Sequence, residues 1–265
     1  MTNAAAVWAS LRKVRETRPL VHNITNFVAM DLSANALLAL GAAPAMIHAV
    51  EEAAEFARIS SAVVINIGTL SPAWVTGMRS AATAAREARR PWVLDPVGCG
   101  ATGYRTGVAR DLAALAPTLI RGNASEIMAL AGASAGRTRG VDSTDSSDAA
   151  RAIAVEVASD YGCIVGVTGE IDYVTDGNRT LAVHGSDAML TRVTATGCAL
   201  SAVCGAFLAA VPDPLTATAH AFAAFGAAGA RAARAADGPG SLRVRLLDEL
   251  YRLDEAALEA EVRIA

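Results

Sequence analysis

The sequence predicts an α/β fold: a three-layer α/β/α sandwich with a mostly parallel central sheet and an antiparallel edge. Short runs of β-branched and apolar residues alternate with amphipathic helical runs over most of the 265 residues. Strands of a parallel sheet are buried on both faces, so they consist of nearly continuous apolar residues, as residues 62–67 do. Hydrophobic residues form 53% of the chain and aromatic residues only 5%, which predicts a core of Ala, Val, Leu and Ile.

The first half of the chain has a regular alternation of strands and helices. Each predicted strand is a short apolar run, and each predicted helix carries its apolar residues on one side. Starting with a strand, the predicted elements alternate as 19–23, 26–40, 43–47, 50–59, 62–67, 72–89, 92–94, 105–115 and 118–120.

A polar segment interrupts this alternation near the middle of the chain. Gly, Ser, Thr, Asp and Arg dominate residues 133–147, which predicts an exposed loop. A helix at 148–160 and a strand at 163–167 follow at once, so the loop is not a domain linker. We therefore expect a single domain over residues 1–265.

The last predicted strands form the antiparallel edge of the sheet. Residues 171–175, 180–184 and 189–193 predict a meander, with a hairpin turn at Asp176-Gly177-Asn178. From Gly197 the chain is predicted to be helical to its end, apart from two segments rich in Pro and Gly, 212–214 and 238–240.

Composition limits the partners and the compartment. A net charge of −3 and the lack of a basic run predict a small-molecule partner and no nucleic acid. The N-terminus lacks a signal-peptide pattern, and the longest apolar stretch, 217–230, is too short to span a bilayer, so we expect a cytoplasmic protein without a membrane partner. The four cysteines occur singly, which predicts reduced thiols rather than a zinc site or disulfides.

The use of lysine excludes two classes of nucleotide enzyme. Lys13 is the only lysine in the chain, so neither a Walker A loop nor the protein-kinase pattern is present. No GxGxxG follows the first predicted strand, which argues against a dinucleotide-binding dehydrogenase. Any phosphate chemistry must therefore use arginine, backbone amides and a metal ion.

A turn of small residues, 194–201, has the character of an anion site. It opens an alanine-rich helix, and the first N–H groups of a helix have no intrahelical acceptor. Small residues from Ala195 to Ala199, including Thr196 and Gly197, let a phosphoryl oxygen approach the backbone itself. Cys198 then faces the anion.

Further polar and small residues follow the predicted strands. In a sheet of this kind ligands bind where parallel strands end at their carboxyl edges. The residues at these positions are His22, Asn23, Asn26, Met46, 95–98, 121–123, Glu126, 168–170 and 196–198.

Two carboxylates in this set are suited to a metal ion. Asp95 and Glu126 are hard oxygen donors, and Mg²⁺ in proteins uses one or two carboxylates together with substrate phosphates. The alternative is a helix cap for Asp95 and a first-turn carboxylate for Glu126, both common in α/β proteins. Their joint placement at the sheet edge favours the metal site.

Three other residues are suited to phosphate or substrate. Arg121 ends a strand and fits a bidentate phosphate contact, although a surface ion pair is the alternative. Thr168 offers a hydroxyl beside a glycine. Met46 would line an apolar pocket, or simply belong to the core.

Cys198 has two contending roles. A thiol at a helix N-terminus is expected to have a lowered pKa and could act as nucleophile or base. Alternatively it fills space, as we expect for the other three cysteines. Phosphoryl transfer depends mainly on positioning and charge stabilisation, so a residue beside the attacking hydroxyl need not be a strong base.

Eight segments together, in order and across nearly the whole chain, resemble the hydroxyethylthiazole kinases, thiamine-salvage enzymes of the ribokinase-like superfamily. They are 19–26, 34–35 with 37–46, 66–70, 94–98, 120–126, 167–170, 196–198 and 238–241. The resemblance implies a ribokinase-like fold and phosphorylation of the hydroxyl of 4-methyl-5-(2-hydroxyethyl)thiazole, with ATP as co-substrate and Mg²⁺ as cofactor. It also implies a homotrimer whose substrate pocket lies between subunits.

The resemblance also implies a role for each candidate residue. The residues that it assigns to ATP binding are Arg121, Thr168, Thr196 and Gly197, and those that it assigns to the thiazole are Met46, Ala195 and Asn26. It assigns Asp95 and Glu126 to the metal ion and the phosphates, with Asn26 near them. The catalytic residue that it implies is Cys198.

Two positions depart from the patterns of related kinases. The family usually has glycine where this chain has Ala195, and glycine tolerates positive φ better. We expect the methyl group to be tolerated, with a slightly altered pocket. Cys198 stands where sugar and pyrimidine kinases of the superfamily carry an aspartate base.

Two alternative functions follow from these positions. Another ribokinase-like enzyme, either a hydroxymethylpyrimidine kinase or an ATP-dependent hydrate dehydratase, would be expected to have aspartate in place of Cys198. A non-catalytic nucleotide sensor would need Arg121 and Thr168, but not Asp95, Glu126 and the anion site together.

Overall fold

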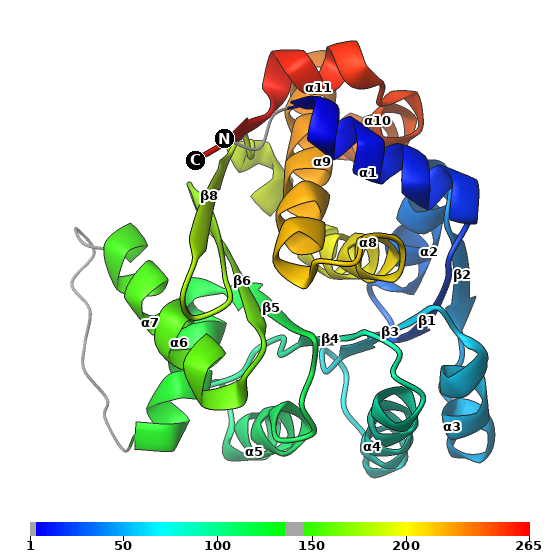
Figure 1. Ribbon diagram of the computed structural model, residues 1–265, viewed down its shortest axis with the longest axis vertical. Helices are drawn as coiled ribbons and strands as arrows, with labels where there is room; N and C mark the ends of the chain where they lie inside the picture. Colours follow the sequence, from blue (N-terminus) through cyan, green and yellow to red (C-terminus); the bar gives the residue numbers. More distant parts are fainter. Residues whose placement is uncertain (1–3, 136–145) are drawn as a thin grey trace.

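The computed structural model describes residues 4–135 and 146–265, and within them a single nine-stranded sheet forms the middle layer (Figure 1). The strand order is β2-β1-β3-β4-β5-β6-β7-β8-β9. The strands are β1 (Leu20–Ile24), β2 (Ala43–Met46), β3 (Ala62–Asn66), β4 (Trp92–Asp95), β5 (Leu119–Asn123), β6 (Ile164–Thr168), β7 (Asp172–Thr175), β8 (Thr180–His184) and β9 (Arg263–Ile264).

The sheet is parallel over its first six strands and antiparallel at one edge. Strands β2, β1, β3, β4, β5 and β6 pair in parallel, whereas β6–β7, β7–β8 and β8–β9 are antiparallel pairs. The parallel register places Asn66 beside Asp95 and Asn123 beside Thr168. The predicted mostly parallel sheet with an antiparallel edge is confirmed.

Helices cover both faces of the sheet and make the three predicted layers (Figure 1). On one face lie α3 (Val50–Ile59), α4 (Pro72–Glu87), α5 (Gly103–Ala113), α6 (Ala124–Ala135) and α7 (Ser146–Tyr161). On the other lie α1 (Ala4–Thr17), α2 (Met30–Leu40), α8 (Thr196–Ala210), α9 (Pro214–Ala235), α10 (Pro239–Arg252) and α11 (Glu255–Glu261).

Alternation along each strand divides the core into two clusters. In β3, Val64 belongs to the cluster under α8, and its neighbours Val63 and Ile65 belong to the cluster against α4. Small residues let the helices approach closely. A Cβ added at Gly205 of α8 would lie 2.7 Å from Val64 Cγ2, so α8 rests directly on the sheet.

The segment 189–193, predicted as a strand, is a 3₁₀ helix, η1 (Ala188–Arg192). Asp187 caps the start of this helix, because its side chain accepts the Met189 N–H at 2.8 Å. The apolar residues that follow favoured a strand in the sequence-based prediction. Beyond β7, the second partner of β8 is β9, from the far end of the chain, where a continuous helix was predicted. Ile264 is buried there, which explains why the last residues leave the helix.

Other predicted boundaries differ in smaller ways. Helix α2 begins at Met30 rather than at residue 26, because Asn26 Oδ1 accepts the N–H groups of Val28 and Ala29 in a turn. The predicted loop 133–147 lies largely outside the described residues, and its described ends belong to α6 and α7.

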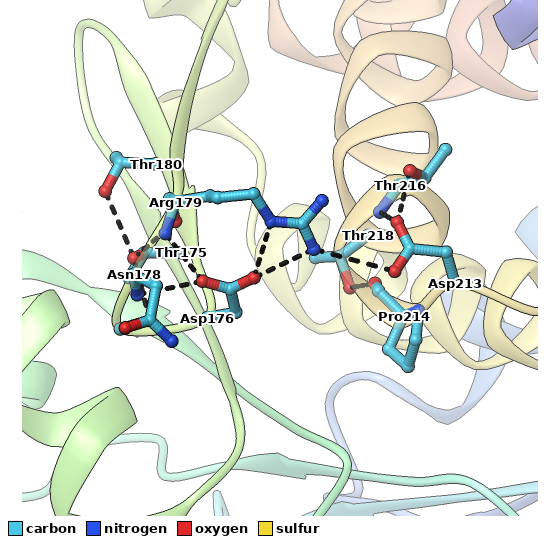
Figure 2. Close-up of polar contacts among 10 residues, drawn as sticks. Thr175, Asp176, Asn178, Arg179, Thr180, Asp213, Pro214, Thr216 and Thr218 are labelled. Carbon is cyan, nitrogen blue, oxygen red and sulfur yellow. Dashed lines mark hydrogen bonds and ion pairs between the residues drawn. The ribbon is translucent and has the colours of Figure 1, made fainter.

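The predicted hairpin turn between β7 and β8 is confirmed (Figure 2). Asp176 Oδ1 accepts the N–H groups of Asn178 and Arg179 at 2.9 and 2.6 Å. The Arg179 guanidinium pairs with Asp176 and reaches Asp213 at 3.8 Å. Since Asp213 caps α9 by accepting the Thr216 N–H, this arginine ties the hairpin to the start of α9.

Helix α9 contains the alanine-rich stretch 217–230, which is buried within the protein. Over residues 4–135 and 146–265, no helix is both long and apolar enough to cross a membrane.

His220 of α9 makes stability depend on pH. Its Nδ1 hydrogen-bonds to Ser10 Oγ at 2.7 Å, its Nε2 has no partner, and burial lowers the pKa of His220 from 6.5 to about 4. Between pH 6.5 and pH 4 this histidine is protonated in the unfolded chain but not in the folded one. Its contribution to the free energy of unfolding is therefore complete above pH 6.5 and is lost as the pH falls toward 4. We expect this group to lower the free energy of unfolding by about 2 kcal/mol between pH 7 and pH 5.

The measurement is urea unfolding of the native protein and His220→Gln at both pH values. Asp95 and Asp172 have pKa values raised to about 6 by burial and act in the opposite direction, so the difference between the two proteins is the quantity to compare. Equal pH dependence in both proteins would contradict the prediction.

Candidate active site

A row of buried polar side chains crosses the carboxyl ends of four adjacent parallel strands. In each strand, the residue two positions before the polar one is apolar and packs in the cluster under α8. Side chains two positions apart in a strand lie on the same face of the sheet, so all four polar side chains point toward α8. The polar residues are Asn23 in β1, Asn66 in β3, Asp95 in β4 and Arg121 in β5, with exposed fractions of 0%, 1%, 0% and 7%.

Asn66 links Asp95 of this row to Asn26, which follows β1. Its Nδ2 donates to Asp95 Oδ2 at 2.7 Å, and its Oδ1 accepts from Asn26 Nδ2 at 2.8 Å. Asn66 Oδ1 also accepts the Gly68 N–H at 2.9 Å. The predicted residues Asn26 and Asp95 are thus joined through an asparagine.

The first turns of α8 close the network from above the sheet. Ser201 Oγ donates to Asp95 Oδ2 at 2.8 Å, and Cys198 Sγ lies 3.5 Å from Asn26 Nδ2. Asp95 Oδ1 is buried without a partner. Burial raises the pKa of Asp95 to about 6, even though Arg121, Ser201 and Asn66 favour its charged form.

Glu126 ties together the loops that follow β4 and β5. Its Oε1 accepts the Gly98 N–H and its Oε2 the Asn123 N–H, both at 2.9 Å. The geometry is that of a first-turn carboxylate, the alternative that the sequence left open. Glu126 nevertheless lies near enough to raise the pKa of Asp95. Among the described residues, no group of three or more Asp, Glu, His or Cys side chains is arranged to hold a metal ion.

Arg121 points toward β6 and the start of α8. Its Nη2 donates to Thr168 Oγ1 at 2.8 Å, and its Nε is buried without a partner. A Cβ added at Gly197 would lie only 2.7 Å from Arg121 Nη1, so the α8 backbone is in direct contact with the guanidinium. Arginine, threonine and a helix N-terminus converge here, as anion binding requires.

The turn before α8 has a left-handed residue. Ala195 has φ 67° and ψ 5°, the conformation for which glycine was expected. Thr196 fixes the turn by donating its hydroxyl to the carbonyl oxygens of Leu190 and Val193 at 3.1 and 3.2 Å.

A cavity of about 610 Å³ opens beside this turn. All four residues predicted for the ATP side line it: Arg121, Thr168, Thr196 and Gly197. Leu190, Leu200 and Phe225 give it an apolar side. Asp95, Asn26, Cys198 and Met46 are not among its lining residues.

The expectation of a lowered Cys198 pKa is wrong. Burial, with a smaller contribution from the negative charge of Asp95, raises the pKa of the Cys198 thiol to about 11. The hydrogen bonds from Asn26 and Asn66 and the charge of Arg121 act in the other direction but are weaker. The position at a helix N-terminus was visible in the sequence, whereas the buried carboxylate beneath it was not.

Met46 ends the edge strand β2 and is half-buried, as are the other residues of that strand. It is paired in register with Asn23 of β1. Nearby, His48 stacks on Trp74 with ring centroids 4.6 Å apart, and Trp74 meets Phe27 at 4.8 Å. Phe27 is 69% exposed, so apolar surface lies open beside Asn26.

Sequence reasoning missed Asn66 and Ser201 as site residues. Asn66 is a polar residue in an otherwise apolar strand, and Ser201 follows Cys198 by nearly one helical turn; both signals were available. Their partner in each case is Asp95, which only the fold brings near.

The sandwich resembles a pyridoxal kinase from Staphylococcus aureus, solved in complex with AMP-PCP, with a TM-score of 0.61 and 17% identity over 80% of this chain and 88% of that chain. This likeness concerns the fold alone. Within this fold, the cavity lined by Arg121, Thr168 and the start of α8 has the groups that bind a phosphate-containing small molecule.

Closer relatives define the family. The model of the hydroxyethylthiazole kinase family matches residues 11–256. A hydroxyethylthiazole kinase from Rhizobium rhizogenes is 53% identical over 96% of this chain and 95% of its own, and one from Granulibacter bethesdensis is 52% identical over 98% and 96%. The solved structure of hydroxyethylthiazole kinase protein from Pyrococcus horikoshii OT3 is 45% identical with a TM-score of 0.92, covering 98% of both chains. The chain belongs to the hydroxyethylthiazole kinase family.

Gly197 provides a test of the Arg121 contact. In Gly197→Ala the new methyl group would displace the guanidinium from Thr168, because the buried arginine has little room to move. We expect the KM for ATP to rise about tenfold, since a hydrogen bond to a charged group contributes roughly 1.5–3 kcal/mol.

Gly240→Ala is the matched control, since Gly240 occupies the same second position of its helix and nothing lies within 4 Å of an added Cβ. Steady-state kinetics at varied ATP measure both variants. The same KM in the two would show that the Gly197 contact has no role in binding.

The Cys198 thiol is expected to react slowly with iodoacetamide. At a pKa of about 11 only about 0.1% of it is thiolate at pH 8. The labelling rate of the Cys198 peptide, followed by mass spectrometry, should rise about tenfold per pH unit from pH 7 to pH 10. Fully buried Cys204 of the same helix is the control for unfolding. Fast labelling that levels off near pH 7 would contradict the raised pKa.

Proposed function

We propose that this chain phosphorylates the hydroxyl of 4-methyl-5-(2-hydroxyethyl)thiazole, with ATP as the co-substrate, through the residues gathered at the carboxyl edge of its sheet. Membership of the hydroxyethylthiazole kinase family supports this reaction. The comparisons give no support to the pyrimidine kinase, hydrate dehydratase or sensor alternatives. The observation that best supports the location of the site is the contact of Arg121 with both Thr168 and the start of α8.

In this proposal the phosphates of ATP lie in the cavity beside α8. Arg121 and Thr168 bind them, while the N–H groups of Thr196 and Gly197 face the phosphoryl group being transferred. The apolar side formed by Leu190, Leu200 and Phe225 accepts the nucleoside.

Mg²⁺ is proposed at Asp95 and Glu126, which fit it unequally. Asp95 Oδ1 is a buried oxygen without a partner, which is the donor a cation requires. Both Glu126 oxygens already accept a backbone N–H, so we assign it a contact through water. When bound, the ion would neutralise charge on the phosphates.

The acceptor hydroxyl is proposed to lie beside Cys198, with Asn26, Ala195 and Met46 around the thiazole. With a pKa raised to about 11, the thiol is neutral at pH 7 and positions the alcohol rather than removing its proton. Phosphoryl transfer has a loose transition state and needs little base assistance, so positioning by Cys198 and Asn26 is sufficient.

A homotrimer is proposed with its contacts near the N-terminal strands. The edge strand β2 is only half-buried, and exposed apolar side chains lie close to it in sequence: Phe27 and Val28 before α2 and Leu38 within it. Light scattering on the purified protein should give three times the 27.1 kDa of one chain. Residues 1–265 are proposed to act as one kinase domain, supported by the single sheet.

A substrate panel tests the function directly. The purified protein is given the thiazole alcohol, hydroxymethylpyrimidine or thiamine, each with ATP and Mg²⁺, and ADP release is measured. Of the three alcohols, we expect only the thiazole alcohol to be turned over. Asp95→Asn keeps the side-chain shape but removes the charge, and should lower kcat at least 100-fold. Turnover only on another alcohol would overturn the assignment.

A further inference from the structure

Arg105, in the first turn of α5, connects the two loops that follow β3 and β4. Its guanidinium donates to three carbonyl oxygens: Ile67, Val97 at 2.9 Å and Gly68 at 3.3 Å. Ile67 and Gly68 belong to the loop after β3, and Val97 to the loop after β4. The side chain is half-buried, so these bonds are partly shielded from water.

The loop after β4 is shaped to admit this side chain. Gly98 has φ 70°, and a Cβ added there would lie 3.1 Å from Arg105 Cδ and 3.3 Å from its Nε. A glycine in the left-handed region therefore lets the arginine stem pass against the backbone. Arg105 and Gly98 form a fitted pair rather than a chance surface contact.

One end of this contact acts on the acceptor side of the site. The carbonyl of Gly68 is held by Arg105, and its N–H donates to Asn66 Oδ1. A Cβ at Gly68 would lie 2.5 Å from Asn26 Nδ2, so the Gly68 backbone packs directly on the side chain that contacts Cys198. Holding Gly68 therefore holds Asn26.

The other end acts on the carboxylate side. Arg105 holds the carbonyl of Val97, and the next residue, Gly98, donates its N–H to Glu126. The loop after β4 is thus held between a cation on one side and a carboxylate on the other, directly beyond Asp95. A shift of this loop would move Asp95 and Glu126 relative to each other.

We propose that Arg105 is a positioning residue for the phosphoryl transfer: it keeps the loops after β3 and β4 in fixed relation, and so aligns Asn26 and Cys198 with Asp95 and Glu126. The inference rests on the proposed function. It places Arg105 outside the contact with ATP, because the cavity lined by Arg121 and Thr168 does not include it.

A second arginine nearby makes an ion pair but contacts neither of the two loops. Arg79 of α4 pairs with Asp111 of α5 and is exposed. Removing it loosens the contact between α4 and α5, the helices that follow these two loops, without changing a carbonyl contact of the site. Arg79→Met is therefore the matched control for Arg105→Met, which keeps most of the side-chain volume.

The first experiment measures kcat and the two KM values for the full-length native protein, Arg105→Met, Arg105→Lys and Arg79→Met, with Tm for each. We expect Arg105→Met to lower kcat about 100-fold, the effect of a misplacement of about 1 Å, with less than a threefold change in the KM for ATP. Lysine should recover about tenfold of the loss, and Arg79→Met should stay within twofold of the native kcat. A kcat for Arg105→Met within threefold of native, or an equal loss in Arg79→Met, would overturn the proposal.

The second experiment needs no substrate and separates the two proposals. The alkylation rate of Cys198 is measured in the same proteins, and it should change at least fivefold in Arg105→Met but not in Arg79→Met. Release of Asn26 alters both the access to the thiol and the hydrogen bond that favours its thiolate. A native protein inactive on the thiazole would refute the proposed function while leaving this comparison intact. An unchanged alkylation rate in Arg105→Met would refute the role of Arg105.

Discussion

The close packing of α8 on the sheet is the constraint on which the site depends. Gly205 lets the helix rest on Val64 and Val21, and the N-terminal end of the helix then lies over the carboxyl ends of the strands. Along the same side of α8, Ser201 reaches Asp95, Cys198 reaches Asn26 and Gly197 meets Arg121. A larger residue at position 205 would lift the helix, and all three contacts would lengthen together.

This packing also determines the electrostatics of the site. Because α8 covers the strand ends, Asp95 is fully buried, and its pKa and that of Cys198 are both raised. Arg121 is the cation that most favours the charged form of Asp95, yet its own hydrogen bond goes to Thr168. Asp95 keeps one oxygen unpartnered, and Arg121 keeps its Nε unpartnered. Unpaired groups of both signs in one buried site are expected where a charged ligand completes the network.

The fold was largely predictable from the sequence, because apolar runs and amphipathic helices report burial directly. The end of each parallel strand then located Asp95, Arg121 and Thr168 without any knowledge of contacts. The failures have a common origin in partners distant along the chain. The strand β9 pairs with β8 from the far end of the chain, and Asp95 changes the Cys198 pKa across about a hundred residues. Arg105 has no motif of its own, since its three acceptors are backbone carbonyls on two separate loops.

Ala195 shows how a departure from the family pattern can be accommodated at small cost. A left-handed conformation costs a residue with a Cβ roughly 1–2 kcal/mol relative to its ordinary conformations. Against this, alanine loses less backbone entropy on folding than glycine, by about 0.4–1 kcal/mol. Its methyl group also packs against the core cluster under α8. These terms nearly cancel, so position 195 does not require glycine for stability. The consequence of the extra methyl group therefore lies in the shape of the turn that faces the substrates.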